Sequence, residues 1–236
     1  MLKKIKLVAV DIDGTLTRKR GDVLLSIEAI EAIRALEDNG IVTSLISGNS
    51  LPVTAGLAGY IGSSGPALGE NGCIALYRGE LIHLCSGKPG REVVERLKPL
   101  GFRETWQNSF RVHEIALMHP KPTREVLARA FSIVEEMGYR ALWSGYAIHI
   151  QPPGLGKGKA LEKIAVMLGL SMDEVAAVGD GENDVEMLSV AGFSATPSDA
   201  ADEAKRVASY VASEPGGHGF REIASLILGR GNSYYL

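Results

Sequence analysis

The stretch IKLVAVDIDGT, residues 5–15, joins a short apolar run to two carboxylates and a Gly-Thr turn. Residues 5–10 have the apolar content of a buried strand, and Asp11 and Asp13 follow at its carboxyl end. Alternate side chains of an extended chain share a face, so both carboxylates are expected on the same side. One can attack phosphorus while the other handles a proton, and together they attract a hard cation. The stretch therefore indicates phosphoryl chemistry.

The composition sets limits on the function. The 236 residues are enough for one large domain or for two domains of unequal size, and the 45% of hydrophobic residues allow a sizeable core. Charged residues make up 22% and the net charge is −3, so nothing indicates a nucleic-acid partner. Asp11 ends the first apolar run after six residues, too few for a signal sequence or a membrane span. Cys73 and Cys85, 12 residues apart without metal-ligand spacing, are expected to be free thiols in a reducing compartment. We expect a cytoplasmic protein.

Strand-like and helix-like periods alternate over most of the chain. Strands are predicted over residues 5–10, 41–46 and 175–178 and near residue 193. Helices are predicted over residues 27–38 (capped by Ser26), 51–61, 160–168, around 185–188, and over 220–228. This order predicts an α/β fold, with a Rossmann-like parallel sheet core and helices on both faces. Ligands of such sheets bind beyond the carboxyl ends of the strands.

The middle of the chain departs from this alternation. Residues 91–100 and 123–137 are predicted helices, and each precedes two predicted strands, 102–106 with 111–118 and 139–143 with 147–151. A doubled αββ unit forms its own antiparallel sheet, so we predict an inserted α+β (αββαββ) domain over residues 85–153. Residues 1–84 and 154–236 then form the core, and Gly- and Pro-rich segments at 87–90 and 152–154 are the hinges. The alternative is a long excursion packed on the main sheet.

Several polar and aromatic residues of the insertion are expected to be structural. The five histidines are scattered without metal-ligand spacing, and His113 and His149 are expected to be hydrogen-bonded structural residues. Trp106 and Trp143 are expected in the apolar core of the insertion. Arg111 could bind a substrate carboxylate, but an exposed position is the stronger expectation.

Two further segments offer groups for phosphate. Ser47-Gly48-Asn49 ends the second strand as Asp11 ends the first, and a hydroxyl with free backbone N–H groups suits a phosphate oxygen. Lys157 lies in a glycine-rich segment just before a helix, where a lysine can neutralise phosphate charge. The segment lacks the spacing and the Ser or Thr of a Walker A loop. Lys159 competes with Lys157, which we prefer.

The segment Gly-Asp-Gly-Glu-Asn-Asp, residues 179–184, follows the strand at 175–178 and begins a helix. Its acidic groups repel one another unless a cation lies among them. Asp180 and Asp184, four residues apart at a strand-to-helix turn, can reach one Mg²⁺ directly or through water. The spacing excludes an EF-hand, and a plain N-cap cluster is the remaining alternative.

With these four motifs in order, the chain resembles the haloacid dehalogenase superfamily of phosphohydrolases. The Glu-Asn-Gly at 70–72 and the Lys-Gly-x-Ala-Leu at 157–161 are similar to its Cof-like branch. The compact length and the Ser-Gly-Asn at 47–49 resemble the archaeal-type phosphoglycolate phosphatases within that branch. The resemblance covers essentially the whole chain and implies that the insertion is a cap domain over the catalytic core.

The resemblance also implies roles for the motif residues. Asp11 would be the nucleophile that forms an aspartyl-phosphate, and Asp13 the acid that protonates the leaving alcohol and then activates water. Ser47, Gly48 and Lys157 would bind the phosphate. The Mg²⁺ ligands would be Asp11, Asp180, Asp184 and, through its backbone carbonyl, Asp13. A small phosphorylated metabolite, with 2-phosphoglycolate first, would be the substrate.

Other functions stay open at this point. A sugar-phosphate phosphatase or a phosphomutase would carry the same motifs, and a non-catalytic phosphate-binding module is a further alternative. Dehalogenases of the superfamily lack the second Asp, and its transport ATPases have Lys-Thr after the nucleophile, so neither fits Asp13. We expect no nucleic-acid or membrane partner, and the oligomeric state is open, with a homodimer as one option.

Overall fold

The computed structural model describes residues 5–229, and its main layer is a five-stranded sheet in the order β12–β11–β10–β1–β2. The strands are β1 (Leu7–Val10), β2 (Val42–Leu45), β10 (Val175–Val178), β11 (Phe193–Thr196) and β12 (Tyr210–Val211). Each pairs in parallel with its neighbour, as predicted. The carboxyl ends of β1, β2 and β10 therefore lie together at one end of the sheet.

Helices cover both faces of this sheet. One layer consists of α1 (Ile27–Asp38), α2 (Leu51–Ile61) and α8 (Gly216–Ile227). The other consists of α5 (Lys157–Met167), α6 (Val185–Val190) and α7 (Asp202–Val207). Val8 and Val10 of β1 pack in the first layer, and Leu7 and Ala9 in the second, as the period of a strand requires. Both predicted helical layers are thus present, and no helix of residues 5–229 is long and apolar enough to cross a membrane.

A second, three-stranded sheet extends from the end of β2. It consists of β3 (Ala67–Gly69), β4 (Ile74–Tyr77) and β5 (Glu80–His83), paired antiparallel. A parallel bridge between Ile46 and Leu68 joins it to the core sheet. The short 3₁₀ helix η1 (Glu70–Gly72) connects β3 with β4. No strand was predicted for this segment.

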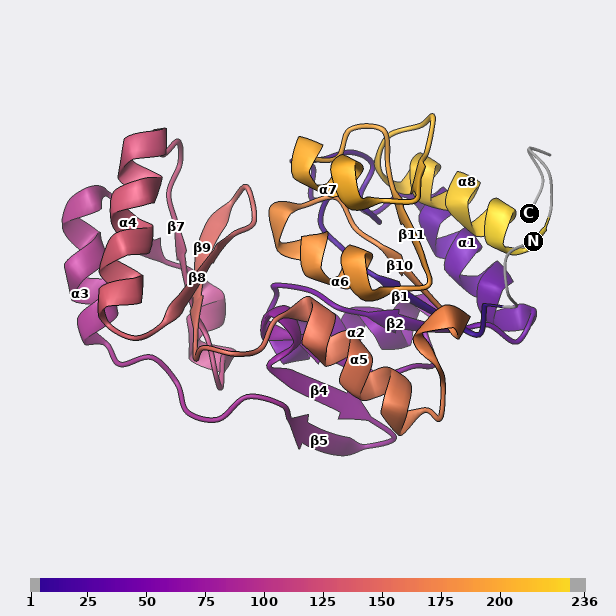
Figure 1. Cartoon of the computed structure of the whole chain (residues 1–236), viewed down its shortest axis with the longest axis horizontal. Helices are drawn as coiled ribbons and strands as arrows, with labels where there is room; N and C mark the ends of the chain where they lie inside the picture. Colours follow the sequence, from indigo (N-terminus) through magenta and orange to yellow (C-terminus); the bar gives the residue numbers. More distant parts are fainter. Residues whose placement is uncertain (1–4, 230–236) are drawn as a thin grey trace.

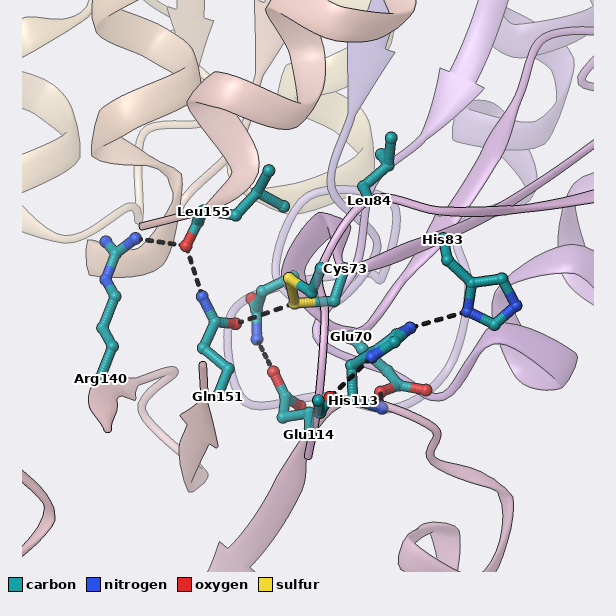
Figure 2. The surroundings of a disulfide bond; sticks show 12 residues. Glu70, Cys73, His83, Leu84, His113, Glu114, Arg140, Gln151 and Leu155 are labelled. Carbon is teal, nitrogen blue, oxygen red and sulfur yellow. Dashed lines mark hydrogen bonds between the residues drawn. A yellow bond between two sulfur atoms is a disulfide. The ribbon is translucent and has the colours of Figure 1, made fainter. Parts of the chain in front are cut away.

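This sheet corrects the prediction of free thiols, because Cys73 and Cys85 form a disulfide (Figure 2). The two cysteines flank the hairpin of β4 and β5, in which Ile74 is opposite His83. The hairpin returns the chain on itself and brings the two Cα atoms to 4.8 Å despite 12 residues of separation. The spacing of the two cysteines was compared only with the spacings of metal ligands, so this pairing was not predicted. Because the two cysteines are paired, they no longer indicate a reducing compartment, and a cytoplasmic location stays a prediction.

The inserted segment forms a four-stranded antiparallel sheet in the order β6–β7–β9–β8, separate from the core sheet. Its elements are α3 (Glu92–Leu97), η2 (Lys98–Leu100), β6 (Arg103–Glu104), η3 (Trp106–Phe110), β7 (Ile115–Met118), α4 (Arg124–Glu136), β8 (Arg140–Trp143) and β9 (Ala147–Gln151). Helices α3 and α4 lie on the side of this sheet that faces away from the core (Figure 1). The predicted αββαββ order is confirmed, with η3 in place of a continuous strand pair. The exact domain boundaries at residues 84/85 and 153/154 stay a prediction.

The two faces of the cap sheet differ in polarity. Ile148 and Ile150 of β9 pack with the cap helices in an apolar cluster. His149 and Gln151, between and beyond them, are buried on the opposite face, where they make hydrogen bonds. Trp143 packs against the apolar cluster, as expected. The expectation for Trp106 is wrong: it is 69% exposed, because η3 lies outside the sheet at this position.

Candidate active site

The site begins where the parallel strands of the core end. Val10 of β1 lies opposite both Leu45 of β2 and Val178 of β10. The next residue, Asp11, donates its backbone N–H to the Val178 carbonyl at 2.9 Å. Register alone therefore brings the side chain that follows β1 beside the loop that follows β10.

The loop after β10 is shaped by its own acidic residue. Asp184, in η5 (Glu182–Asp184), accepts the backbone N–H groups of Asp180 and Gly181 at 3.0 and 2.8 Å. A side chain at Gly179 would overlap the Asp184 carboxylate, so the glycine is required for this turn. Gly14, with φ +89°, is required in the same way because a Cβ there would overlap the Asp180 carboxylate.

Asp11, Asp180 and Asp184 thereby form one buried cluster. A carboxylate oxygen from each lies within 4.8 Å of those of the other two, and the three residues are at most 5% exposed. Thr15 donates its hydroxyl to Asp180 at 3.2 Å. Buried carboxylate oxygens at this spacing are the donor set that hard divalent cations take. The structure confirms that these three predicted residues converge, and the cluster can hold a metal ion.

Lys157, the first residue of α5, is fully buried beside this cluster. Its Nζ donates to Asp11 Oδ1 at 2.5 Å and to Asp184 Oδ1 at 2.6 Å. Lys159, the competing candidate, is exposed and bonds the Gly154 carbonyl instead. The structure therefore brings Lys157 to the end of the strands and leaves Lys159 outside.

The charges of this cluster do not balance within the protein. Burial raises the pKa of Asp11 well above its ordinary value, and Asp184 and Asp180 raise it further against the opposing effect of Lys157. Burial, with repulsion from Asp184, raises the pKa of Asp180 to about 7. Burial lowers the pKa of Lys157, but the carboxylates of Asp11 and Asp184 outweigh it, so the pKa is raised. Three buried carboxylates face one ammonium group, which favours binding of a cation.

Asp13 and the Ser47 loop form a neighbouring group. Ser47 is fully buried, and its Oγ accepts the backbone N–H of Asn49 at 3.0 Å. Asn49 donates its side-chain amide to Asp13 Oδ2 at 2.7 Å and to Ser47 Oγ at 3.0 Å. Asp13 is exposed and lies outside the metal-binding cluster found among the described residues. Its ligand role through the backbone carbonyl stays a prediction.

The polar face of the cap sheet closes over this region. Arg111 donates to the Gly48 carbonyl at 2.8 Å and is paired with Glu114. Arg111 was expected to be exposed, but it is only 6% exposed because the cap packs on the Ser47 loop at this point. Glu114 is fully buried and also accepts from His149 Nδ1 at 2.7 Å and from Asn71 at 2.8 Å.

The pattern of strands, carboxylates and lysine has clear counterparts among known proteins. The haloacid dehalogenase-like hydrolase family matches residues 8–103 and 116–221, which is most of the chain. The chain belongs to this family. A protein from Aeropyrum pernix named phosphoglycolate phosphatase is 48% identical over 225 residues, 95% of this chain and 94% of that one. Phosphoglycolate phosphatase 1 from Saccharolobus solfataricus is 39% identical over 95% of this chain and 96% of its own length.

Solved structures share the whole fold of the chain, core and cap together. A crystal structure from Thermoplasma acidophilum superposes with a TM-score of 0.86 at 30% identity, covering 96% of this chain and 99% of that one. A haloacid dehalogenase-like hydrolase from Bacteroides thetaiotaomicron, at 21% identity and a TM-score of 0.74, covers 95% of this chain and 100% of its own. The second likeness shows the fold alone. Core and cap therefore occur together in other members of the family.

Sequence reasoning missed how the loop at residues 70–72 ties this hydrolase's core to its cap. Glu70 accepts the backbone N–H groups of Val112 and His113 at 2.8 and 2.7 Å. Figure 2 shows Glu70 beside His113. Asn71 bonds Glu114 and accepts from Asn183 at 3.0 Å. Glu70 and Asn71 have positive φ angles of 55° and 52°, which few non-glycine residues adopt. The only sequence signal was the Glu-Asn-Gly noted as a family likeness.

Two histidines of the hydrolase also meet, although they are thirty residues apart in the chain. His83 Nδ1 and His113 Nε2 lie 2.8 Å apart, and His113 Nδ1 bonds the Gly87 carbonyl at 2.8 Å. His149 bonds Glu114 and lies 3.2 Å from Ser144 Oγ. His113 and His149 are hydrogen-bonded, as predicted, and their structural role stays a prediction. Both connect segments that are far apart in the sequence.

Proposed function

We propose that the chain is a magnesium-dependent phosphomonoesterase that hydrolyses a small phosphorylated metabolite, with 2-phosphoglycolate as the first substrate to test. The observation that carries the proposal is the buried cluster of Asp11, Asp180 and Asp184 around the ammonium group of Lys157. The relatives named phosphoglycolate phosphatase, which match nearly the full chain, support this choice of substrate.

The donor set fits Mg²⁺, which prefers carboxylate oxygens and retains several waters. Asp11, Asp180 and Asp184 would hold the ion, with Asp13 adding its backbone carbonyl. When bound, the ion neutralises charge between the anionic nucleophile and the phosphate. Lys157 performs part of the same task from the protein side, because its ammonium group opposes the rise in the pKa of Asp11 that burial causes and attracts the phosphate.

The first step transfers the phosphoryl group to Asp11. An oxygen of Asp11 forms a bond to phosphorus while the ester P–O bond breaks, and the electron pair of that bond passes to the alcohol oxygen. Asp13 gives its proton to this oxygen, so that the neutral alcohol leaves. The Ser47 hydroxyl, the Gly48 backbone and Lys157 hold the phosphate oxygens during the transfer.

The second step restores the enzyme. Asp13, now a carboxylate, takes a proton from water as the water oxygen bonds to phosphorus. The bond between phosphorus and Asp11 breaks, its electron pair returns to the Asp11 carboxylate, and inorganic phosphate leaves. Asp13 is thereby protonated again for the next ester.

The test is the release of phosphate from 2-phosphoglycolate, a panel of sugar phosphates and para-nitrophenyl phosphate, with Mg²⁺ or with EDTA. We expect turnover with Mg²⁺, none in EDTA, and the highest kcat/KM on 2-phosphoglycolate. Asp11→Asn should lose at least about 10³-fold in kcat, because an amide of the same shape is nearly non-nucleophilic, and its circular dichroism should be unchanged. Hydrolysis that persists in EDTA, or that survives in Asp11→Asn, contradicts the proposed chemistry.

The substrate panel also tests the other interpretations. A sugar-phosphate phosphatase would show its highest kcat/KM on one of the sugar phosphates. A phosphomutase would convert a sugar phosphate to its isomer without releasing phosphate. A binding module would bind phosphate and release none from any ester.

A further inference from the structure

A glutamine of the cap reaches the loop that carries the phosphate-binding residues of the core. Gln107 lies in η3, partly buried, and its Oε1 accepts the backbone N–H of Ser50 at 2.7 Å. Its Nε2 donates to Asn49 Oδ1 at 2.7 Å. Asn49 in turn donates to Asp13 Oδ2 at 2.7 Å. Two hydrogen bonds of equal length thus connect the cap with the carboxylate of Asp13, and the bond from Ser50 holds Gln107 at their start.

The direction of this chain of hydrogen bonds is fixed at one end. The backbone N–H of Ser50 can only donate, so the carbonyl oxygen of Gln107 must face it. The amino group of Gln107 then faces Asn49, whose carbonyl oxygen must accept. This orientation leaves the Asn49 amino group for Asp13, which as a carboxylate can only accept.

Besides Gln107, only the Asp13 carboxylate itself, among the described residues, favours this orientation of the Asn49 amide. The other polar neighbour of the amide, Ser47 Oγ, lies 3.0 Å away and can donate as well as accept. A rotated amide would direct its carbonyl oxygen at Asp13 and repel the carboxylate. The cap residue therefore fixes which end of Asn49 meets Asp13 independently of Asp13 itself.

We propose that Gln107 is a positioning residue that makes proton transfer at Asp13 depend on the seating of the cap, that is, on its docking against the core at Asn49 and Ser50. The inference rests on the proposed function, in which Asp13 protonates the leaving alcohol. Asn49 holds Oδ2 of Asp13, so Oδ1 is the oxygen that carries the proton toward the substrate. With the cap seated, the amide orientation holds this carboxyl group in place. With the cap away, the hydrogen bond that fixes the orientation is absent.

The test uses two substrates that differ in their need for a proton. The alkoxide leaving from 2-phosphoglycolate must be protonated, whereas para-nitrophenolate is a weak base that leaves without a proton. The value of kcat/KM covers the steps through the first departure of the leaving group. We expect Gln107→Ala to lower kcat/KM for 2-phosphoglycolate by about 10-fold or more, a part of the 10²–10⁴-fold that general acid catalysis supplies. For para-nitrophenyl phosphate we expect a loss under about twofold.

Two further variants separate positioning from cap docking. Gln107→Glu keeps the carbonyl oxygen for Ser50 but has no donor for Asn49, so it should reproduce the selective loss. Glu186→Ala removes the partner of Arg140, a contact of the cap with α6 that does not involve Asn49. In this variant the docked cap keeps the bond between Gln107 and Asn49, and only the docked fraction falls. Because the docked form is taken to react with both substrates, kcat/KM should fall for both by the same factor.

The outcomes decide between the two proposals. A loss confined to 2-phosphoglycolate in both Gln107 variants supports the inference. An equal loss on both substrates, or no loss on either, overturns it while the proposed function stands. A wild-type protein that releases phosphate from neither substrate overturns the proposed function and the inference together.

Discussion

At the scale of single residues, Lys157 is a buried cation whose removal leaves two buried carboxylates without their partner. Its Nζ bonds both Asp11 and Asp184, and its side chain is fully buried. We expect Lys157→Met to lower the unfolding free energy in EDTA at pH 8 by about 3–5 kcal/mol, the usual cost of breaking a buried ion pair from one side. Denaturant unfolding measures this change. Lys159→Met, at an exposed position two residues away, is the matched control and should change stability by less than about 0.5 kcal/mol. Equal stability of the two variants would contradict the buried pairing.

Asp180 makes the stability of the metal-free protein depend on pH. Burial and the neighbouring Asp184 raise its pKa from 3.8 to about 7 in the folded protein. A folded protein that binds the proton more tightly than the unfolded chain is stabilised below pH 4. It loses this contribution as the pH rises toward 7. We expect the free energy of unfolding in EDTA to fall over this range by on the order of a few kcal/mol.

Mg²⁺ should reverse this dependence, because it favours the charged form of Asp180. The increase in Tm on adding Mg²⁺ should therefore be larger at pH 8 than at pH 5, as measured by scanning calorimetry. Asp180→Asn should flatten the pH dependence in EDTA and reduce the effect of Mg²⁺. A Mg²⁺ effect of equal size at both pH values would show that protons and the cation do not compete at this cluster.

At the scale of helices and strands, local signals predicted the core well. The strand at Val175–Val178 and the helix at Leu51–Ile61 agree with the structure to the residue, because strong apolar patterns and turn residues delimit them. Ser26 caps α1 through the backbone N–H of Ala29, as predicted. The catalytic candidates follow strands or precede helices, and parallel register brings such positions together. Their convergence was therefore predictable.

Contacts between distant segments were not predictable in this way. The strands β3, β4 and β5 are three or four residues long, and a bridge between Leu68 and Ile46, just after β2, joins them to the core although no local pattern shows it. The burial of Arg111 depends on the docking of the cap on Gly48. The orientation of Asn49 depends on Gln107, 58 residues later. Local periodicity contains no information on such pairings, which arise only when the two sheets meet.

The disulfide stabilises the hairpin of β4 and β5, one of the elements that the sequence did not predict. The bond between Cys73 and Cys85 closes the hairpin of β4 and β5 at its base. Cross-linking a loop of this size restricts the unfolded chain and contributes about 2–3 kcal/mol. We expect reductant to lower the Tm of the wild-type protein, measured by circular dichroism. The double variant Cys73→Ser, Cys85→Ser should begin at the lower Tm and show no response to reductant. Titration with a thiol reagent should find no accessible thiol in the denatured, unreduced protein, and two thiols there would contradict the bond.

At the scale of the whole molecule, cap and core meet through charges that neither exposes to water. Glu114 of the cap is fully buried and accepts from Arg111, His149 and Asn71, and Asn71 belongs to the core. Burial alone would raise the pKa of Glu114, but His149 and Arg111 outweigh it, so the pKa is lowered. Its contribution to stability is thus present above pH 4.5 and is lost as the pH falls through the lowered value. The cap should therefore dock more firmly on the core at neutral pH than in acid.

Replacing Glu114 tests this interface directly. Glu114→Gln leaves the Arg111 guanidinium buried without its counter-charge, so we expect a loss of about 3–5 kcal/mol at pH 7 and a smaller difference near pH 4. A less firmly docked cap releases the connecting segment at residues 86–90 from its hydrogen bonds to His113 and Arg111, so limited proteolysis there should be faster. Glu95→Gln, on α3, removes an ion pair with Lys98 that lies in solvent and should change neither readout. If Glu114→Gln and Glu95→Gln are cleaved at the same rate, the buried network does not hold the cap on the core. The dependence of Asp13 on Gln107 would then require another source of cap seating, for which the Arg140–Glu186 pair is the next to replace.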